Sequence, residues 1–231
     1  NQAVLIKPDY AEAHYNLGVT LREIGDLDNA IESYKQALKH NNHYPKAHNN
    51  LGQIYLVKGV LDLALDHLEW AVALQPEFSD AHNNLGSAYL GSNKVLDAIE
   101  SYKKAVSLNP SFSIAFNNLG IGYQRLGKEA LAAEQFENAI ELNPNYATAH
   151  HNLSGVKKFK SGDLQFAQIE SLLSQKDIGQ PDRILLNFAL AKAHEDMGNN
   201  KDFFRALNEA NNLRKETSNY SIDKSENHNQ I

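Results

Sequence analysis

The 231-residue sequence contains no cysteine, and this absence excludes disulfide bonds, zinc–thiolate sites and thiol nucleophiles. It also lacks any apolar run near the roughly 18 residues that a membrane-spanning helix needs. Its 22 lysines and arginines are outnumbered by 28 aspartates and glutamates and form no basic run, which argues against nucleic-acid binding. We therefore expect a cytoplasmic protein that binds neither nucleic acid nor membranes.

Signatures of catalysis are missing as well. The sequence has no Walker loop, no HExxH motif and no G-x-S-x-G elbow. Gly120 and Gly122 form a Gly-Ile-Gly triplet without a third glycine at dinucleotide-binding spacing, so we interpret them as sites of close helix packing. The sequence predicts a protein that is not an enzyme and carries no cofactor.

One stretch of sequence recurs at a fixed interval of 34 residues. Its most complete copy is His82-Asn83-Asn84-Leu85-Gly86, and the leucine of this motif returns in every copy. The five leucines are Leu17, Leu51, Leu85, Leu119 and Leu153. A fixed period of this length indicates stacked repeats, in which each unit buries its apolar face only against its neighbours.

Each 34-residue unit contains two segments with helical periodicity. In the third unit they cover about 79–92 and 95–107, with apolar or small residues recurring at i, i+3, i+4 and i+7. Between the two segments lies a residue that tolerates left-handed backbone: Gly25, Gly59, Asn93 or Gly127. A proline follows the second segment in most units: Pro8, Pro76, Pro110 and Pro144. The pattern predicts about six tandem helical hairpins.

These residues resemble the tetratricopeptide repeat family, whose pattern combines an aromatic residue, Leu-Gly, Tyr, Ala, Phe and Pro. The third unit matches at His82, Leu85, Gly86, Tyr89, Ala98, Tyr102, Ala105 and Pro110. The fourth unit matches at Phe116, Leu119, Gly120, Tyr123, Ala132, Phe136, Ala139 and Pro144. The resemblance covers almost the whole chain and implies an all-α, right-handed superhelical solenoid of tandem helix-turn-helix repeats.

The repeat pattern divides the chain into five parts. We predict the second half of a truncated repeat at 1–10, four regular repeats at 11–146, a degenerate repeat at 147–183, a C-terminal capping repeat at 184–217 and a polar tail at 218–231. In the degenerate repeat Ser154 takes the glycine slot and Lys157 the tyrosine slot. The half-repeat carries Ala3-Val4-Leu5-Ile6, whose unpaired apolar edge makes self-association through the terminal repeats a further possibility.

A column of asparagines follows another face of the first helix in each unit. It consists of Asn16, Asn50, Asn84, Asn118 and Asn152, with Asn49, Asn83 and Asn117 beside three of them. In the family this face lines the concave surface, and the column resembles the asparagine ladder of O-linked N-acetylglucosamine transferase. A carboxamide offers two donors and an acceptor, so it can pair with a peptide group. We predict that these eight residues bind an extended peptide of a protein partner.

A second interpretation of the column stays open, because asparagine at this place in the repeat also serves to bridge neighbouring helices. Five amide contacts of about 0.5–1.5 kcal/mol each barely offset an association cost of about 4–15 kcal/mol. Side-chain pockets must therefore contribute to affinity. Candidate walls are Tyr15, Val19, Gln53, Leu56, Ile121, Gln124 and Arg125.

Two other functions of the family fit poorly. The carboxylate clamp of chaperone-binding members needs Lys, Asn and Arg at inner positions that here hold Tyr15, Val19, Asn50, Asp80 and Asn84. Histidines occupy the aromatic slot at His14, His48, His82 and His150. Because neighbouring copies lie about 10 Å apart, they are too distant to share a metal ion, and we interpret them as packing residues.

The last repeat carries a second resemblance. Residues 185–198, with Phe203-Phe204 and Asn211-Asn212-Leu213-Arg214, are similar to the closing repeat of bacterial proteins in which a tetratricopeptide array precedes a sulfotransferase domain. This similarity implies an alternative function, the substrate-recognition arm of a larger sulfotransferase or glycosyltransferase whose catalytic domain lies outside this sequence. The favoured prediction is a non-catalytic scaffold that binds an extended peptide in its concave groove.

Overall fold

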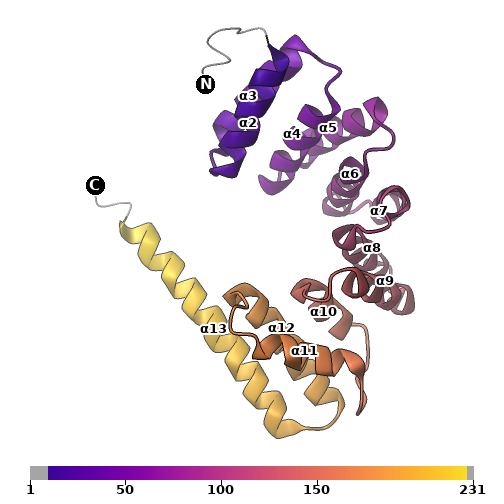
Figure 1. Cartoon of the computed structure of the whole chain (residues 1–231), viewed down its shortest axis with the longest axis vertical. Helices are drawn as coiled ribbons and strands as arrows, with labels where there is room; N and C mark the ends of the chain where they lie inside the picture. The colour runs from indigo at the N-terminus through magenta and orange to yellow at the C-terminus, as the bar shows by residue number, and fades with distance from the viewer. Residues whose placement is uncertain (1–9, 228–231) are drawn as a thin grey trace. The chain divides into compact units, whose positions relative to one another are not determined.

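The computed structural model describes residues 10–227, with side chains to residue 217, and this part of the chain is all helical (Figure 1). Its twelve helices are α2 (Ala11–Glu23), α3 (Leu27–His40), α4 (Pro45–Val57), α5 (Leu61–Leu74), α6 (Ser79–Gly91), α7 (Val95–Leu108), α8 (Ser113–Arg125), α9 (Glu129–Leu142), α10 (Ala147–Ser154), α11 (Leu164–Ser174), α12 (Gln180–Asp196) and α13 (Asn200–Asn227). They confirm the predicted all-α repeat. The predicted half-repeat lies outside the described residues, except for Tyr10.

The chain divides into two compact units, Asn1–Gly122 and Tyr123–Ile231. In the first unit helices of 13 and 14 residues alternate, joined within each pair by three residues. The helices of each pair pack on one another, and α3 and α5 also pack on the first helix of the next pair. This regular alternation is the stacked arrangement that the 34-residue period predicts.

The turn inside each pair depends on one left-handed residue. Gly25 has φ +82°, Gly59 +72°, Asn93 +60° and Gly127 +69°. In the first of these turns the amide of Gly25 donates to Arg22 O at 3.0 Å and the next amide donates to Leu21 O at 2.9 Å. This is a Schellman motif, which satisfies carbonyls at the end of the helix. The sequence prediction of left-handed caps at these four residues is confirmed.

The core of the first unit pairs a glycine on one helix with a large side chain on the next. A Cβ added at Gly86 would lie 2.6 Å from Cε1 of Tyr102, and one added at Gly18 would lie 2.7 Å from Cε1 of Tyr34. Both tyrosines are almost completely buried. The glycine is therefore required by close helix approach, as the sequence predicts for Gly86.

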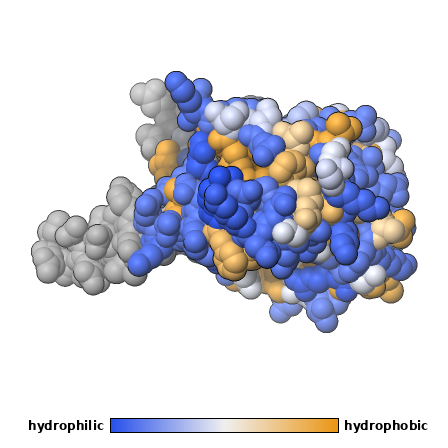
Figure 2. Space-filling model, turned by 90° about the horizontal axis from the view of Figure 1, so that it is seen from below, coloured by the Kyte–Doolittle hydropathy of each residue, from blue (hydrophilic) through white to orange (hydrophobic). Residues whose placement is uncertain are grey.

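On the surface, hydrophilic residues cover most of the face drawn in Figure 2, with apolar residues between them.

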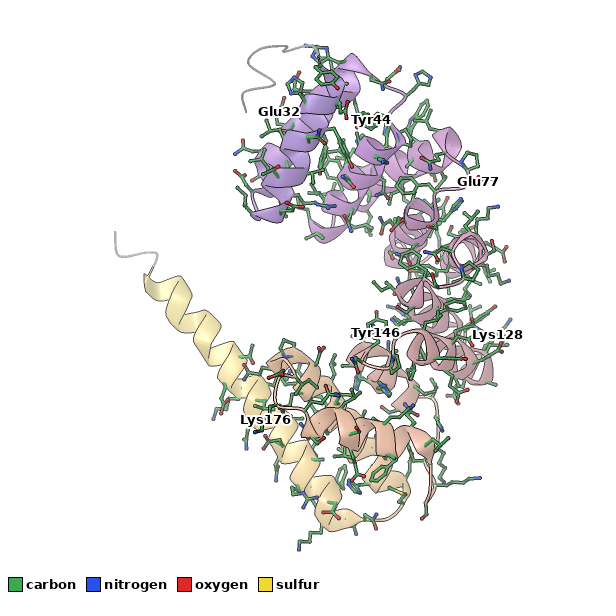
Figure 3. The ribbon with its side chains drawn as sticks, viewed as in Figure 1. Glu32, Tyr44, Glu77, Lys128, Tyr146 and Lys176 are labelled. Atoms are coloured by element: carbon green, nitrogen blue, oxygen red, sulfur yellow. The ribbon has the colours of Figure 1, made fainter. Side chains whose placement is uncertain are left out.

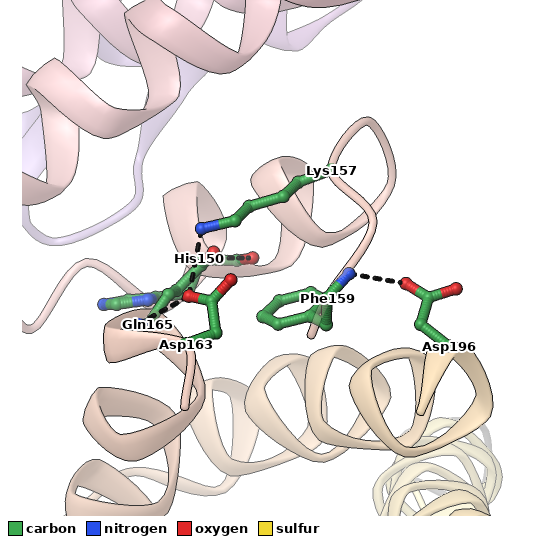
Figure 4. A network of polar contacts seen from close by, with 6 residues as sticks. All are labelled: His150, Lys157, Phe159, Asp163, Gln165 and Asp196. Atoms are coloured by element: carbon green, nitrogen blue, oxygen red, sulfur yellow. Dashed lines mark hydrogen bonds and ion pairs between the residues drawn. The ribbon is translucent and has the colours of Figure 1, made fainter. Parts of the chain in front are cut away.

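The second unit departs from the regular repeat at α10. α10 has only eight residues and ends at Ser154, the residue that replaces the glycine of the motif. The chain then runs through a loop that buries Phe159, which is 1% exposed, against Ile169 and Leu186. Figure 4 shows how polar contacts hold this loop. The degenerate sequence thus replaces the end of a helix with a packed loop.

Three hydrogen-bonded contacts fix the loop in place (Figure 4). The amide of Phe159 donates to Oδ2 of Asp196 at 3.1 Å. Nζ of Lys157 lies 3.0 Å from Oδ1 of Asp163, and the same carboxylate oxygen accepts from the Gln165 amide at the start of α11. The ion pair therefore joins the beginning of the loop to the N-cap of the next helix.

The last two helices are longer than the sequence predicts. α12 begins at Gln180, four residues before the predicted capping repeat, and α13 extends to Asn227. Residues 218–227, expected as part of a polar tail, thus continue the backbone of α13. The two helices pack on each other, and Nε2 of Gln180 donates to the Leu213 carbonyl at 3.5 Å. Among the described helices, none combines the length and apolar character needed to cross a membrane.

Candidate functional site

A groove of about 650 Å³ lies along the first helices of the repeats in the first unit. Its lining comes from α2, α4, α6 and α8 and from the residues just before α6 and α8. Five of its side chains are asparagines from the predicted columns: Asn49, Asn50, Asn83, Asn84 and Asn118. The stacking of the repeats therefore brings most of the predicted site residues together on one surface.

The two columns are hydrogen-bonded to each other across neighbouring repeats. Nδ2 of Asn84 donates to Oδ1 of Asn49 at 2.9 Å, and Nδ2 of Asn118 donates to Oδ1 of Asn83 at 2.9 Å. The two residues of each pair are 35 positions apart in the sequence, which is one repeat plus one residue. The alternative interpretation, in which these amides bridge neighbouring helices, is thus correct for both pairs.

Asn50 occupies the equivalent position one repeat earlier but has different partners. Its Nδ2 donates to the hydroxyl of Tyr34 at 3.1 Å and to that of Tyr15 at 3.4 Å. Its Oδ1 accepts from Nδ2 of Asn49 at 3.4 Å. Burial raises the pKa of Tyr34, so this phenol stays protonated at neutral pH. The carboxamide of Asn50 is buried, and both of its N–H groups point to protein acceptors.

Asn84 and Asn118 each keep an N–H group that has no hydrogen-bond partner in the described part of the protein, whereas both N–H groups of Asn50 are engaged. Both side chains are half-buried, whereas Asn50 is 7% exposed. Each of the two donates one hydrogen bond to the preceding repeat. A carboxamide has two N–H donors and a carbonyl acceptor, so one donor and the acceptor remain for a ligand. A peptide group requires this combination, since it presents one C=O and one N–H.

The remaining predicted residues lie away from this lining. Asn16 is exposed on α2, and Asn117 is 2% exposed on α8. Asn152 is half-buried on α10 in the second unit. Among the predicted walls, Tyr15 and Gln53 line the groove, but Val19, Leu56, Ile121, Gln124 and Arg125 do not.

An aromatic residue stands immediately before α2, α4, α6, α8 and α10, and the predicted site did not include this position. Phe78 and Phe112 line the groove, and the ring of Tyr44 lies 4.8 Å from that of Tyr15. Figure 3 labels Tyr44 and Tyr146, which take this position before α4 and α10. The signal was present in the sequence as a second 34-residue series: Tyr10, Tyr44, Phe78, Phe112 and Tyr146. In this groove the series supplies apolar surface beside the amides.

Charged side chains complete the lining. Nη1 of Arg22 donates to Oε1 of Gln53 at 2.6 Å, and no described carboxylate forms an ion pair with this guanidinium. Lys46 and Asp80 occupy equivalent positions near the start of α4 and α6. The groove therefore presents two cations and one carboxylate, together with polar amides and aromatic rings. These groups can form hydrogen bonds, ion pairs and apolar contacts side by side.

Histidines of the aromatic slot, predicted as packing residues, also make contacts to backbone carbonyls that the sequence did not predict. Nε2 of His82 lies 3.0 Å from the Pro76 carbonyl, and Nε2 of His150 lies 2.9 Å from the Pro144 carbonyl. Burial lowers the pKa of both side chains, so the neutral imidazole donates its Nε2 proton to a loop six residues earlier. Within residues 10–217, no three His, Cys, Asp or Glu side chains are grouped as a metal site.

A second cavity, of about 870 Å³, lies in the second unit and is mainly apolar. It is lined by His151, Pro181, Ile184, Leu185, Phe188, Arg214 and Thr217. It contains no carboxamide, so it does not repeat the hydrogen-bonding chemistry of the first groove.

Comparisons with family models identify three segments of the chain. A model described as TPR repeat matches residues 20–59, and two models described as tetratricopeptide repeat match residues 79–112 and 113–146. All three matches lie within residues 11–146, where the sequence predicts regular repeats. None of these models describes a sulfotransferase or glycosyltransferase, so the resemblance of residues 185–214 to sulfotransferase-linked repeats stays a prediction.

Solved structures of repeat proteins resemble the chain over most of its length. MamA of Desulfovibrio magneticus RS-1, solved as a double mutant, is 30% identical, with 61% of this chain and 79% of that chain covered and a TM-score of 0.56. PilF of Pseudomonas aeruginosa is 20% identical, with 94% and 97% covered and a TM-score of 0.69. YrrB, described as a TPR protein with an unusual peptide-binding site, is 22% identical, with 80% and 94% covered and a TM-score of 0.59. Among curated proteins, none matches this chain significantly.

Proposed function

This chain belongs to the tetratricopeptide repeat family, and on that premise we propose that it is a non-catalytic scaffold that binds an extended segment of a partner protein in the groove along α2, α4, α6 and α8. The observation that carries this proposal is the pair Asn84 and Asn118. Each is held by one hydrogen bond to the preceding repeat and retains one N–H and one carbonyl for a ligand. Two such amides, one repeat apart, can form hydrogen bonds with the backbone of a peptide.

Preorganisation makes these contacts more favourable than those of free side chains. The hydrogen bonds to Asn49 and Asn83 already restrict the rotamers of Asn84 and Asn118. Less side-chain entropy is therefore lost when a ligand binds. Asn50 serves instead to position its neighbours, because its donors are engaged by Tyr15 and Tyr34. The asparagine column is thus divided between ligand contact and structure.

The rest of the affinity comes from the side chains around the amides. Phe78 and Phe112 offer apolar surface, and Arg22 and Lys46 offer positive charge. Hydrogen bonds to backbone contribute about 0.5–1.5 kcal/mol each, which is too little to hold a peptide alone. Sequence preference of the groove then depends on these flanking residues, whereas the asparagines recognise any peptide backbone.

The test is a selection of peptides from a random display library on the whole chain, followed by calorimetric titration of the best peptide. Replacing both Asn84 and Asn118 with alanine removes two hydrogen bonds, so we expect affinity to fall about tenfold, which corresponds to about 1.4 kcal/mol. Asn16→Ala is the matched control, because Asn16 is exposed and outside the groove lining. Failure to select any saturable binder, or an unchanged affinity in a folded double variant, contradicts the proposal.

A further inference from the structure

The second helix of the second repeat, α5, has an outward face unlike those of the corresponding helices. It carries Trp70, the single tryptophan of the sequence, and this side chain is 56% exposed. The equivalent positions one repeat earlier and one repeat later hold the polar residues Gln36 and Lys104. Trp70 is not part of the groove described above. An exposed tryptophan at a position that is otherwise polar marks a candidate interaction surface.

The indole of Trp70 is backed by a hydrogen-bonded pair of histidines. Its ring stacks on His48 with centroids 6.0 Å apart and an interplanar angle of 21°. Nε2 of His48 lies 3.2 Å from the Asn42 carbonyl, so this nitrogen carries the proton and Nδ1 is an acceptor. Nδ1–H of His67 then donates to Nδ1 of His48 at 3.0 Å. The ring of His67 in turn stacks on Tyr55 at 5.7 Å. The tryptophan is thus supported on a fixed aromatic layer.

Two carboxylates share a cavity with the exposed indole. Asp66, Glu69, Trp70 and Ala73 line a shallow cavity of about 360 Å³. Glu69 accepts a hydrogen bond from the Tyr89 hydroxyl at 2.9 Å, which orients its carboxylate. Neither Asp66 nor Glu69 forms an ion pair with any described cation. The cavity therefore combines an aromatic face with two carboxylates that form no ion pair within the described part of the chain.

The histidines beneath this cavity add no positive charge at neutral pH. Burial lowers the pKa of His48, and burial together with the neighbouring imidazole lowers the pKa of His67 to about 4. The whole chain has a formal charge of −6, which also favours a cationic partner. The negative charge of the site and that of the chain thus both favour a cationic ligand.

We propose that this cavity binds an arginine side chain from a basic segment of a partner protein, with the guanidinium lying over the indole of Trp70 and paired with Asp66 and Glu69. Arginine fits this site because its planar guanidinium stacks on aromatic faces while its N–H groups donate to carboxylates. Ala73 leaves room beside the ring, where the equivalent positions hold Lys39 and Ser107. The site lies on α5, so it is a contact surface separate from the groove of the first helices.

The experiment titrates the whole chain with the peptide acetyl-Gly-Arg-Gly-Arg-Gly-Arg-Gly-amide and with matched peptides in which citrulline or lysine replaces arginine. Citrulline keeps the shape of arginine but is neutral. Trp70 fluorescence reports contact directly, because the chain has no other tryptophan. We expect a saturable change in Trp70 fluorescence with the arginine peptide, a several-fold weaker response to the lysine peptide and no response to the citrulline peptide. Equal binding of either substitute overturns the assignment to arginine, and no saturable signal at millimolar peptide overturns the site.

Variants then locate the contact by calorimetry, which does not depend on tryptophan. Trp70→Gln introduces the residue found at the same position of the first repeat, and we expect at least a tenfold loss of affinity. Asp66→Asn combined with Glu69→Gln should give a similar loss, while glutamine can still accept from Tyr89. Gln36→Ala and Lys104→Ala, at the positions equivalent to Trp70 in the neighbouring repeats, are the controls. Unchanged binding in Trp70→Gln, or an equal loss in the controls, overturns the proposal.

Discussion

The Nδ1 atoms of His48, on α4, and His67, on α5, lie 3.0 Å apart. One of them must be protonated and the other unprotonated for this contact to be a hydrogen bond. The Asn42 carbonyl near Nε2 of His48 decides the arrangement, because that nitrogen then holds the proton of the ring. A second proton on His48 would occupy its Nδ1 and place a donor against the Nδ1–H of His67. The contact therefore joins the two helices of the second repeat only while the His48 imidazole is neutral.

We expect the free energy of unfolding to fall as the pH is lowered from about 6.5 towards 4. Burial lowers the pKa of His48, and lowers that of His67 to about 4, so the unfolded chain binds these protons first. The stability from neutral imidazoles is complete above the unfolded pKa and is lost as pH falls towards the folded pKa. Urea unfolding at several pH values measures this slope. In His67→Gln, which copies Gln135 of the fourth repeat, the loss on acidification should be smaller, and an unchanged slope contradicts the assignment.

Gly86→Ala should destabilise the first unit by about 1–3 kcal/mol. The new Cβ would lie 2.6 Å from Cε1 of Tyr102, which is 1% exposed and cannot move away freely. Gly91→Ala is a control in the same helix, because its nearest neighbour is the end of the flexible Leu61 side chain. Both changes remove a glycine from a helix, so the difference between them isolates the packing effect. Equal midpoints of chemical denaturation for the two variants would contradict this prediction, because they would show that the helices accommodate the new Cβ at Gly86 without a loss of stability.

Gly59→Ala should cost about 1 kcal/mol through the backbone alone. Gly59 has φ +72°, and a Cβ there would meet no atom within 4 Å, so packing does not contribute. Gly59→Asn is expected to cost less, since Asn93 takes the same conformation one repeat later with φ +60°. Thermal unfolding of the two variants compares them directly. If asparagine destabilises as much as alanine, left-handed backbone is not the reason for glycine at this position.

Phe159→Ala should reduce the stability of the second unit by about 3–5 kcal/mol, because it opens a cavity in the core. The side chain is 1% exposed and packs with Ile169 and Leu186. Phe204→Ala provides the control, as Phe204 is 58% exposed on α13. Amide hydrogen exchange in α11 and α12 measures the local effect. A similar small change in both variants would mean that the loop does not support these helices.

The helices and turns of this protein follow from its sequence because their determinants are local. The 34-residue period and the apolar spacing placed the third pair of helices at about 79–92 and 95–107, and the structure has them at Ser79–Gly91 and Val95–Leu108.. The left-handed caps were predictable for the same reason, since the preference for Gly or Asn acts within one residue. The eight asparagines could also be placed on one helix face, and five of them line the groove.

Tertiary structure decided which polar atoms of those side chains are already engaged in hydrogen bonds within the protein. Asn84 donates to Asn49, 35 residues earlier, because two helices from different repeats are stacked side by side. Local sequence preferences cannot predict a hydrogen bond between residues so far apart in the chain. The same applies to Phe159, which enters the core after α10 ends early, and to Trp70, whose ring is supported by His48 from another helix. The periodicity of a sequence specifies which face a residue takes. The packing of helices distant in sequence determines whether its polar groups are free to bind a partner.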